Sequence, residues 1–555
     1  MGTKMTFGQD ERVLIYGVPA VTLLIWTAST LDPVNLPKML LLVVIAFALL
    51  PGIAEKFKKR KFSQVPKFII LNLMLVIWVG VSTIASSTNS TQSFFGVSGR
   101  FTGALTYISF SLIAIATFYM STKDLNYRIL TGLMISGVLN IIYCGFVIVS
   151  NSDPIPWTNT YGNILGTFGN PNFISSFLGI FNIVLFAKIF DQNSTKWMIV
   201  VSSILILISI LEIVDSQSRQ GLIVTALGCG AVFVYRLFVS SLNTMVKILG
   251  LFLYLLVGVF SFLAMLQIGP LTSYIYKLSV SIRGAYWRAG WETMMQNPIF
   301  GAGPDSFGDW YARVRDSRAM VVPGPDVFTN SPHNVFIEQG ANGGIPLFIL
   351  YLGTQLFILS CGLRYLKNST NFNYIFAASF FGWLGFTAQS LISINQIGLA
   401  VWGYVLGAMT VAIYVQSRMV DTEFQTRART TKVQKVEFRN ILGFGGAVLG
   451  LILAVPPFYA ETNWRSALAS KNLEQIVSAA DQWPQSTDRY IQVSKALYEN
   501  KFNQESLEFV RKGLSFNPNN ARLWYFLYQL PGSTEAEKEA AKAKLKVLDP
   551  NFIVK

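Results

Sequence analysis

The sequence predicts an all-α protein that crosses a membrane many times and carries a smaller helical domain towards its C-terminus. Of its 555 residues, 52% are hydrophobic and only 13% are charged, whereas soluble proteins carry roughly 25% charged residues. Apolar runs of about 17–22 residues recur through residues 1–460, and each is long enough to cross a hydrocarbon core as a helix. The mean hydropathy of +0.45 points the same way.

These runs predict about thirteen membrane spans. The first run is not followed by a small-residue cleavage motif, so we expect a retained helix rather than a signal peptide. The predicted spans are 13–30, 36–54, 67–86, 104–120, 128–150, 172–190, 197–214, 220–239, 246–267, 343–362, 373–393, 397–416 and 441–457.

Basic residues predict the orientation of these spans. The net charge is +15, but much of the excess lies in short loops beside the spans, most densely at 55–61 and 427–439. Cytoplasmic loops gather lysine and arginine in this way, so we expect membrane lipids rather than nucleic acid as partners. The N-terminus is then cytoplasmic, and the long loop 268–342 lies outside an inner (cytoplasmic) membrane. The three cysteines fall in or beside spans and predict neither a disulfide framework nor a metal site.

Residues 461–555 form a second predicted domain after the transmembrane domain 1–460. Ala, Lys, Glu, Asn and Gln become frequent with helical periodicity, and Pro484, Pro518 and Pro550 follow one another at 34 and 32 residues. That spacing is close to the tetratricopeptide repeat of about 34 residues, whose helix pairs stack into a concave binding surface. An odd number of spans places this domain outside, where we expect it to bind a protein partner. An ordinary helical cap is the alternative.

The only histidine, His333, lies in the predicted outer loop. Its ordinary pKa near neutrality suits it to acid–base catalysis. Arginines at membrane depth are costly and therefore mark functional sites. The alternatives are a structural histidine and arginines that extend towards lipid headgroups. The outer arginines are Arg100, Arg219, Arg283 and Arg288.

Short motifs around these residues occur in a characteristic order. They are Thr167-Phe168-Gly169-Asn170-Pro171-Asn172, Ser218-Arg219-Gln220-Gly221, Arg283-x-x-x-Trp287, Asn297-Pro298-x-x-Gly301-x-Gly303-x-x-x-Phe307, and His333-Asn334 with Gly344 eleven positions on. Over residues 90–415 the chain thus resembles the O-antigen ligase superfamily of membrane glycosyltransferases. That group includes O-antigen ligases, O-antigen polymerases and bacterial protein O-oligosaccharyltransferases. One departure is that the superfamily's Ser-Arg-Gly is interrupted here by Gln220.

The resemblance implies a GT-C-like fold and transfer of a glycan from undecaprenyl diphosphate to an acceptor hydroxyl, without nucleotide sugar, cofactor or metal. His333 would be the general base, and Arg219 and Arg283 would hold the diphosphate, because guanidinium groups bind phosphate oxygens in pairs. Weaker candidates for binding or orienting substrate are Arg100, Arg288, Asn334 and Glu338.

The acceptor stays open at this point. A lipid acceptor would make the protein a ligase, a growing glycan would make it a polymerase, and a protein hydroxyl would make it an O-oligosaccharyltransferase. A polysaccharide or lipid transporter is the alternative from another class, although transporters show paired internal repeats that these spans lack. A non-enzymatic assembly scaffold would leave the outer arginines unexplained.

Overall fold

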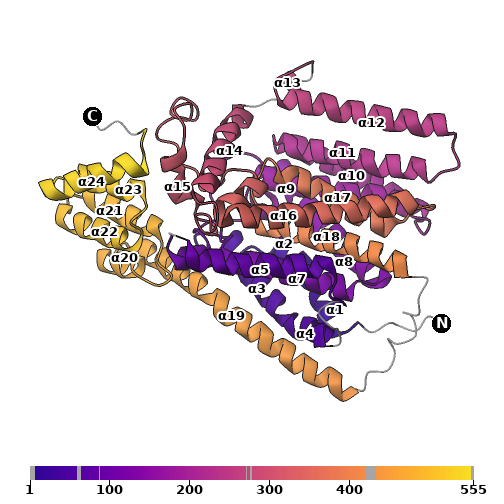
Figure 1. Ribbon diagram of the computed structural model, residues 1–555, viewed down its shortest axis with the longest axis horizontal. Coiled ribbons are helices and arrows are strands. Elements are labelled where there is room, and N and C mark those ends of the chain that lie inside the picture. The colour runs from indigo at the N-terminus through magenta and orange to yellow at the C-terminus, as the bar shows by residue number, and fades with distance from the viewer. Residues whose placement is uncertain are drawn as a thin grey trace.

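The protein is a multi-pass membrane protein built from helices (Figure 1). A computed structural model describes residues 7–58, 64–86, 88–270, 272–275, 278–419 and 433–551, and these contain helices and no strand. Residues 59–61 of the first basic cluster and 427–432 of the second lie outside the described residues. The predicted all-α, polytopic fold is confirmed.

The helices follow one another along the chain with short connections. As far as α19 they are α1 (Gln9–Arg12), the π-helical η1 (Val13–Gly17), α2 (Val18–Leu23), α3 (Asn35–Ala48), α4 (Leu50–Lys58), α5 (Lys67–Ala85), α6 (Ser90–Phe95), α7 (Ala104–Met120), α8 (Lys123–Ser150), the 3-10 turn η3 (Gly166–Phe168), α9 (Pro171–Ile189), α10 (Lys196–Asp215), α11 (Arg219–Phe238), α12 (Thr244–Met265), α13 (Thr272–Ile275), α14 (Leu278–Gln296), α15 (Phe307–Val314), α16 (Val335–Asn368), α17 (Tyr374–Ser390), α18 (Ile397–Met419) and α19 (Val433–Ser470). The C-terminal helices are α20 (Leu473–Ala480), α21 (Thr487–Glu499), α22 (Asn503–Phe516), α23 (Ala521–Gln529) and α24 (Glu535–Leu548).

Within the described residues, ten helical stretches are long and apolar enough to cross a membrane, against about thirteen expected. The predicted spans 104–120 and 373–393 correspond to α7 and α17, which have 17 residues each. The predicted span 13–30 is also shorter, because its helix ends at Leu23. There Lys38 Nζ donates to the carbonyls of Thr22 and Leu24 at 2.6 and 2.9 Å. This buried amine satisfies carbonyl groups that a continuing helix would have used.

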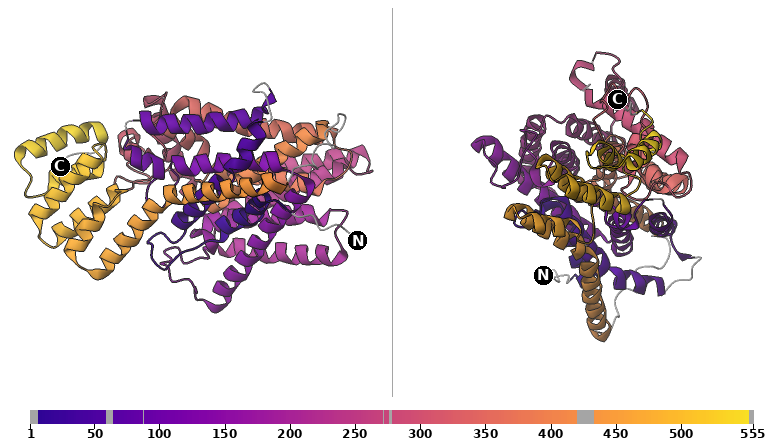
Figure 2. Two further views of the ribbon diagram at one scale, coloured as in Figure 1. Left: turned by 90° about the horizontal axis from the view of Figure 1, so that it is seen from below. Right: turned by 90° about the vertical axis from the view of Figure 1, so that its left-hand side faces the viewer.

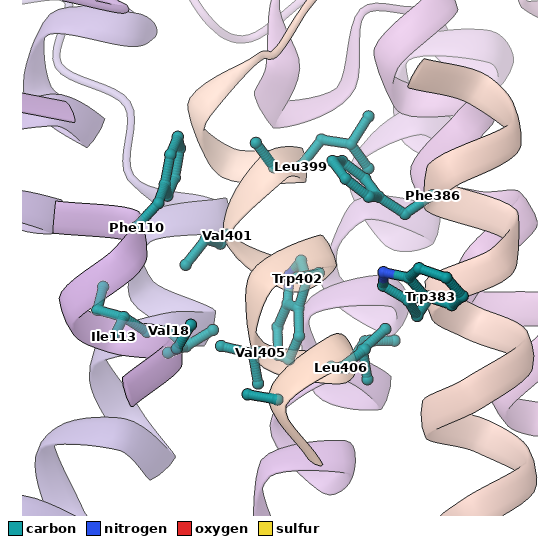
Figure 3. Close-up of a cluster of buried hydrophobic side chains, with 14 of the residues drawn as sticks. Val18, Phe110, Ile113, Trp383, Phe386, Leu399, Val401, Trp402, Val405 and Leu406 are labelled. Atoms are coloured by element: carbon teal, nitrogen blue, oxygen red, sulfur yellow. The ribbon is translucent and has the colours of Figure 1, made fainter. Parts of the chain in front are cut away.

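The core of the bundle lies around α9 and α18. In the most apolar stretch of these two helices, 78% and 83% of the residues are buried, whereas none is buried in α12. Trp402 and Val405 of α18 belong to a cluster shared with Phe110 of α7 and Trp383 of α17 (Figure 3). α12 lies at the edge of the bundle (Figure 1), where its apolar surface can face lipid on most sides.

The long helix α16 is interrupted at Gly343 and Gly344, which leave the helical conformation. The segment 298–303 runs along this break. A Cβ on Gly301 or Gly344 would lie 2.4 Å from the facing backbone, so the close approach requires glycine. Three backbone hydrogen bonds join the segments: Ala302 N to Ala341 O at 2.7 Å, Gly303 N to Asn342 O at 3.0 Å and Ile345 N to Pro298 O at 2.8 Å.

The C-terminal helices gather at one end of the bundle, where α19 leads into them (Figure 2). They dock against α15 and Arg315, the residue that follows it. Arg315 pairs with Asp549 at 2.6 Å, and both side chains are almost fully buried. Asn520 Nδ2 donates to Asp309 Oδ1 at 2.9 Å. The C-terminal domain and the loop that carries His333 therefore lie on one side of the bundle, while the tetratricopeptide relationship stays a prediction.

We expect the buried ion pair between Arg315 and Asp549 to stabilise the docking of the C-terminal helices. Removing one partner of a buried ion pair costs about 3–5 kcal/mol, because the other charge is left uncompensated. We expect Asp549→Ala to lower the Tm of the purified protein in detergent and to speed limited proteolysis of the C-terminal helices.

The matched control is Glu535→Ala, which removes a carboxylate from an exposed pair with Lys538. Exposed pairs contribute about 0–1 kcal/mol, so its Tm should stay near that of the wild type. Equal behaviour of the two variants would contradict the docking role of Asp549.

Candidate active site

His333 is held in a defined position between a tight turn and helix α14. Its backbone is left-handed, with φ of 53°, and its N–H donates to Ser331 Oγ at 3.1 Å. The imidazole stacks against the ring of Tyr286, with centroids 5.6 Å apart and planes 26° apart. Trp287 Nε1 donates to the His333 carbonyl at 3.4 Å. Helix α14 therefore supports both the backbone and the ring of the histidine.

The surroundings of His333 keep its imidazole neutral. Burial, followed by the positive charges of Arg283 and Arg100, lowers its pKa to about 4. The ring is therefore unprotonated at neutral pH and can accept a proton. Because nearby cations contribute to this shift, an anion bound beside them would raise the pKa of His333 again.

Arg283 supplies a cation next to this neutral base. It lies three residues before Tyr286 on α14, and this spacing places both side chains on the same side of the helix. Burial lowers the pKa of Arg283, which still leaves a guanidinium charged at neutral pH. No carboxylate of the described residues pairs with it. Arg283 is thus available for an anionic ligand.

Arg100 has a different setting, because two buried carboxylates hold it. Its Nε lies 3.2 Å from Asp305 Oδ1, its Nη2 pairs with Glu338, and its Nη1 donates to the carbonyl of Asn330 at 2.6 Å. Burial alone would lower the pKa of Arg100, but the two carboxylates outweigh burial and raise it. The guanidinium joins three distant segments, and its charge is balanced within the protein.

Asp305 is a residue of this centre that was not among the predicted site residues. Besides pairing with Arg100, its Oδ2 accepts from Val97 N at 2.9 Å and from Thr102 N at 3.3 Å. Its backbone is left-handed, with φ of 53°. A buried arginine needs a carboxylate partner, and this need was the only signal in the sequence. It does not identify which acidic residue of the loop 268–342 pairs with Arg100.

Two further candidates make contacts of their own. Arg288 Nε pairs with Asp316 Oδ2 at 2.7 Å, and both side chains are largely exposed. Asn334 caps α16, since its Oδ1 accepts from Ile337 N at 3.1 Å. These contacts give Arg288 and Asn334 structural partners, and a role in substrate binding stays a prediction for both.

Arg219 occupies a second position at the same end of the bundle. It begins α11, which starts beside the end of α12 that leads to α14 (Figure 1). The residues around it bind α9: Ser218 Oγ donates to Asn172 Oδ1 at 2.9 Å, and Gly221 N donates to Ser175 Oγ at 3.2 Å. Two motifs far apart in the sequence thus meet here. Arg219 is not among the charges that lower the pKa of His333.

A comparison with protein families finds a match in the part of the chain that carries most of the candidate site residues. Residues 204–352 match the family model described as O-antigen ligase. The match includes Arg219, Arg283, Arg288, His333, Asn334 and Glu338, and it leaves out Arg100. No curated protein matched the chain.

The contrast between Arg100 and Arg283 can be measured as stability. Arg100→Gln leaves Asp305 and Glu338 buried without a cation, so we expect a loss of about 3–5 kcal/mol and a clearly lower Tm in detergent. Arg283→Gln removes a partly buried charge that has no carboxylate partner among the described residues, so its Tm should stay close to that of the wild type. A lower Tm for Arg283→Gln than for Arg100→Gln would contradict the roles assigned here.

Proposed function

We propose that this chain, which belongs to the O-antigen ligase superfamily, transfers a glycan from undecaprenyl diphosphate to an acceptor hydroxyl outside the cytoplasmic membrane. The observation that carries the proposal is a buried, neutral imidazole beside a guanidinium that has no carboxylate partner among the described residues. A base and an anion-binding cation in one place suit a reaction in which a hydroxyl loses a proton while a diphosphate departs.

The bond changes assign a task to each group. The acceptor oxygen forms a bond to the anomeric carbon of the glycan and passes its proton to His333. The bond between that carbon and the phosphate oxygen breaks, and undecaprenyl diphosphate leaves with the electron pair. Arg283, with Arg219 as a second clamp, stabilises the charge that grows on the leaving oxygen.

Charge also links donor binding to the strength of the base. Burial and the two arginines keep the pKa of His333 at about 4, which makes it a weak base. A bound diphosphate would neutralise part of that positive field and raise the pKa of His333 towards neutrality. The imidazole would therefore accept a proton more readily when the donor is present.

The acceptor divides the proposal into three versions. Ligase, polymerase and protein O-oligosaccharyltransferase share the donor and the base, and they differ in whether the hydroxyl belongs to a lipid core, a glycan or a protein. We propose the ligase type, with the other two as alternatives. The C-terminal helices dock beside the loop that carries His333, where they can help to present any of these acceptors.

The break in α16 argues against a transporter. In transporters, unwound backbone carbonyls near the middle of the membrane coordinate ions or substrate. Here protein donors take these carbonyls: Asn342 O accepts from Ser82 Oγ at 2.8 Å, and Gly343 O accepts from Trp78 Nε1 at 2.8 Å. The backbone groups at the break bind the segment 298–303 of the protein itself, whereas in a transporter such groups would bind an ion or substrate.

The central test is transfer by the purified protein in vesicles with an undecaprenyl-diphosphate glycan and candidate acceptors, with the products read by mass. We expect His333→Ala to lower turnover by at least about 100-fold, in the range that a general base contributes, with an unchanged Tm. Glu292→Gln, on an exposed position of the same helix α14, should keep its activity. Undiminished transfer by His333→Ala would remove His333 from the reaction, and the mass of the product identifies the acceptor.

The pH dependence of kcat/KM tests the link between Arg283 and His333. Removing the Arg283 charge makes the protonated imidazole less unfavourable, so the pKa of His333 should rise. In Arg283→Gln the base is then protonated, and activity lost, at a higher pH than in the wild type as the pH falls. An acid limb at the same pH in both proteins would show that the two groups do not interact.

A further inference from the structure

A large polar cavity lies at the far end of α16 from His333. It has a volume of about 1030 Å³ and is formed where α8, α9, α10, α16, α17 and α18 end. His333 lies just before α16 and Asn368 is its last residue, and the unbroken part of the helix between them, residues 345–368, alone spans roughly 36 Å. The cavity is therefore separate from the proposed active site.

Cations outnumber carboxylates in the lining of this cavity. Lys188 is buried, is bonded to Asp191 and lies over the rings of Tyr127 and Tyr374 at 5.0 and 4.7 Å. Lys123 and Arg418 also line the cavity and are exposed. Neither has a carboxylate partner in the part of the chain that the structure describes. The cavity thus carries about two uncompensated positive charges.

A second observation points to an oxygen-rich ligand. Tyr374 lines the cavity and its side chain is 5% exposed, yet its hydroxyl has no hydrogen-bond partner among the described residues. A buried hydroxyl without a partner costs free energy. A phosphate oxygen in the cavity would accept from this hydroxyl and face the two cations.

An apolar surface begins at the same cavity. Met198, on the first turn of α10, lines the cavity. The residue before it, Trp197, is 72% exposed, and the face of α10 that carries Trp197 continues with exposed apolar side chains at Ile204, Leu207 and Leu211, whose exposed fractions run from 49% to 70%. In a membrane this surface faces acyl chains. A polar headgroup site joined to an apolar surface suits a whole phospholipid better than free phosphate.

We propose that this cavity binds the phosphate headgroup of an anionic phospholipid, with an acyl chain lying along α10. The loops around it are those whose basic residues predict a cytoplasmic position, and the cytoplasmic leaflet is the anionic one. The site lies outside the glycan-transfer proposal and does not depend on it.

Native mass spectrometry of the full chain tests this site with phosphatidylglycerol and, as the neutral comparison, phosphatidylcholine. The wild type should retain one phosphatidylglycerol with an affinity at least about tenfold higher than for phosphatidylcholine. Lys123→Gln/Arg418→Gln should remove that preference. Tyr374→Phe should weaken phosphatidylglycerol binding about fivefold, as expected for one lost hydrogen bond.

The matched control is Lys196→Gln/Arg236→Gln, which removes the same charge from the same end of the bundle outside the cavity lining. This variant should keep the wild-type preference, and the Tm of each variant in detergent shows that it folds. An equal loss in the control would overturn the proposal, because the effect would then come from general charge. Displacement of the lipid by millimolar inorganic phosphate would also overturn it, by assigning the site to free phosphate.

Discussion

The buried ion triad of Arg100, Asp305 and Glu338 is the interaction on which the end of the molecule that carries His333 depends. One guanidinium joins the turn before α7, the segment that follows the Gly301–Gly303 motif, and the first turn of α16. Buried charges are costly unless each is paired and hydrogen-bonded. Here the second oxygen of Asp305 takes two further backbone N–H groups. The triad therefore specifies one arrangement of three segments that are remote in sequence.

The position of His333 follows from that arrangement. Glu338 holds the start of α16, Asn334 caps it, and His333 stands directly before the cap. The N-terminal end of the loop that leads to His333 is fixed as well, because the backbone of 298–303 is hydrogen-bonded to α16 around the break at Gly343 and Gly344. The loop between these two anchors is long, but both of its ends are fixed against the same helix. His333 gains in this way the fixed position that its proposed role as a base requires.

The helices and the residues of the candidate site could be predicted from the sequence, because apolar runs, a lone histidine and unusual arginines are local signals. The pairing of Arg100 with Glu338 could not be predicted from the sequence, since 238 positions separate the two residues and several acidic residues were equally plausible partners. The early end of the first helix was hidden for a similar reason, as it depends on Lys38 of the next helix. The sequence ranked Arg283 above Arg100 only through the family resemblance. The structure adds a physical difference, because two carboxylates pair with Arg100 and none of the described residues pairs a carboxylate with Arg283.

The contact between Arg315 and Asp549 has a consequence for how the protein is made. The two residues are 234 positions apart, so at ribosomal rates the loop leaves the ribosome about 10–50 s before its partner is synthesised. During that interval Arg315 has no carboxylate to pair with, and the surface that later receives the C-terminal helices is open to water or to chaperones. The face formed by α15 and the C-terminal helices therefore matures last, after the membrane bundle has been synthesised. A chain interrupted before Asp549 would leave the loop exposed to proteases that remove incomplete products.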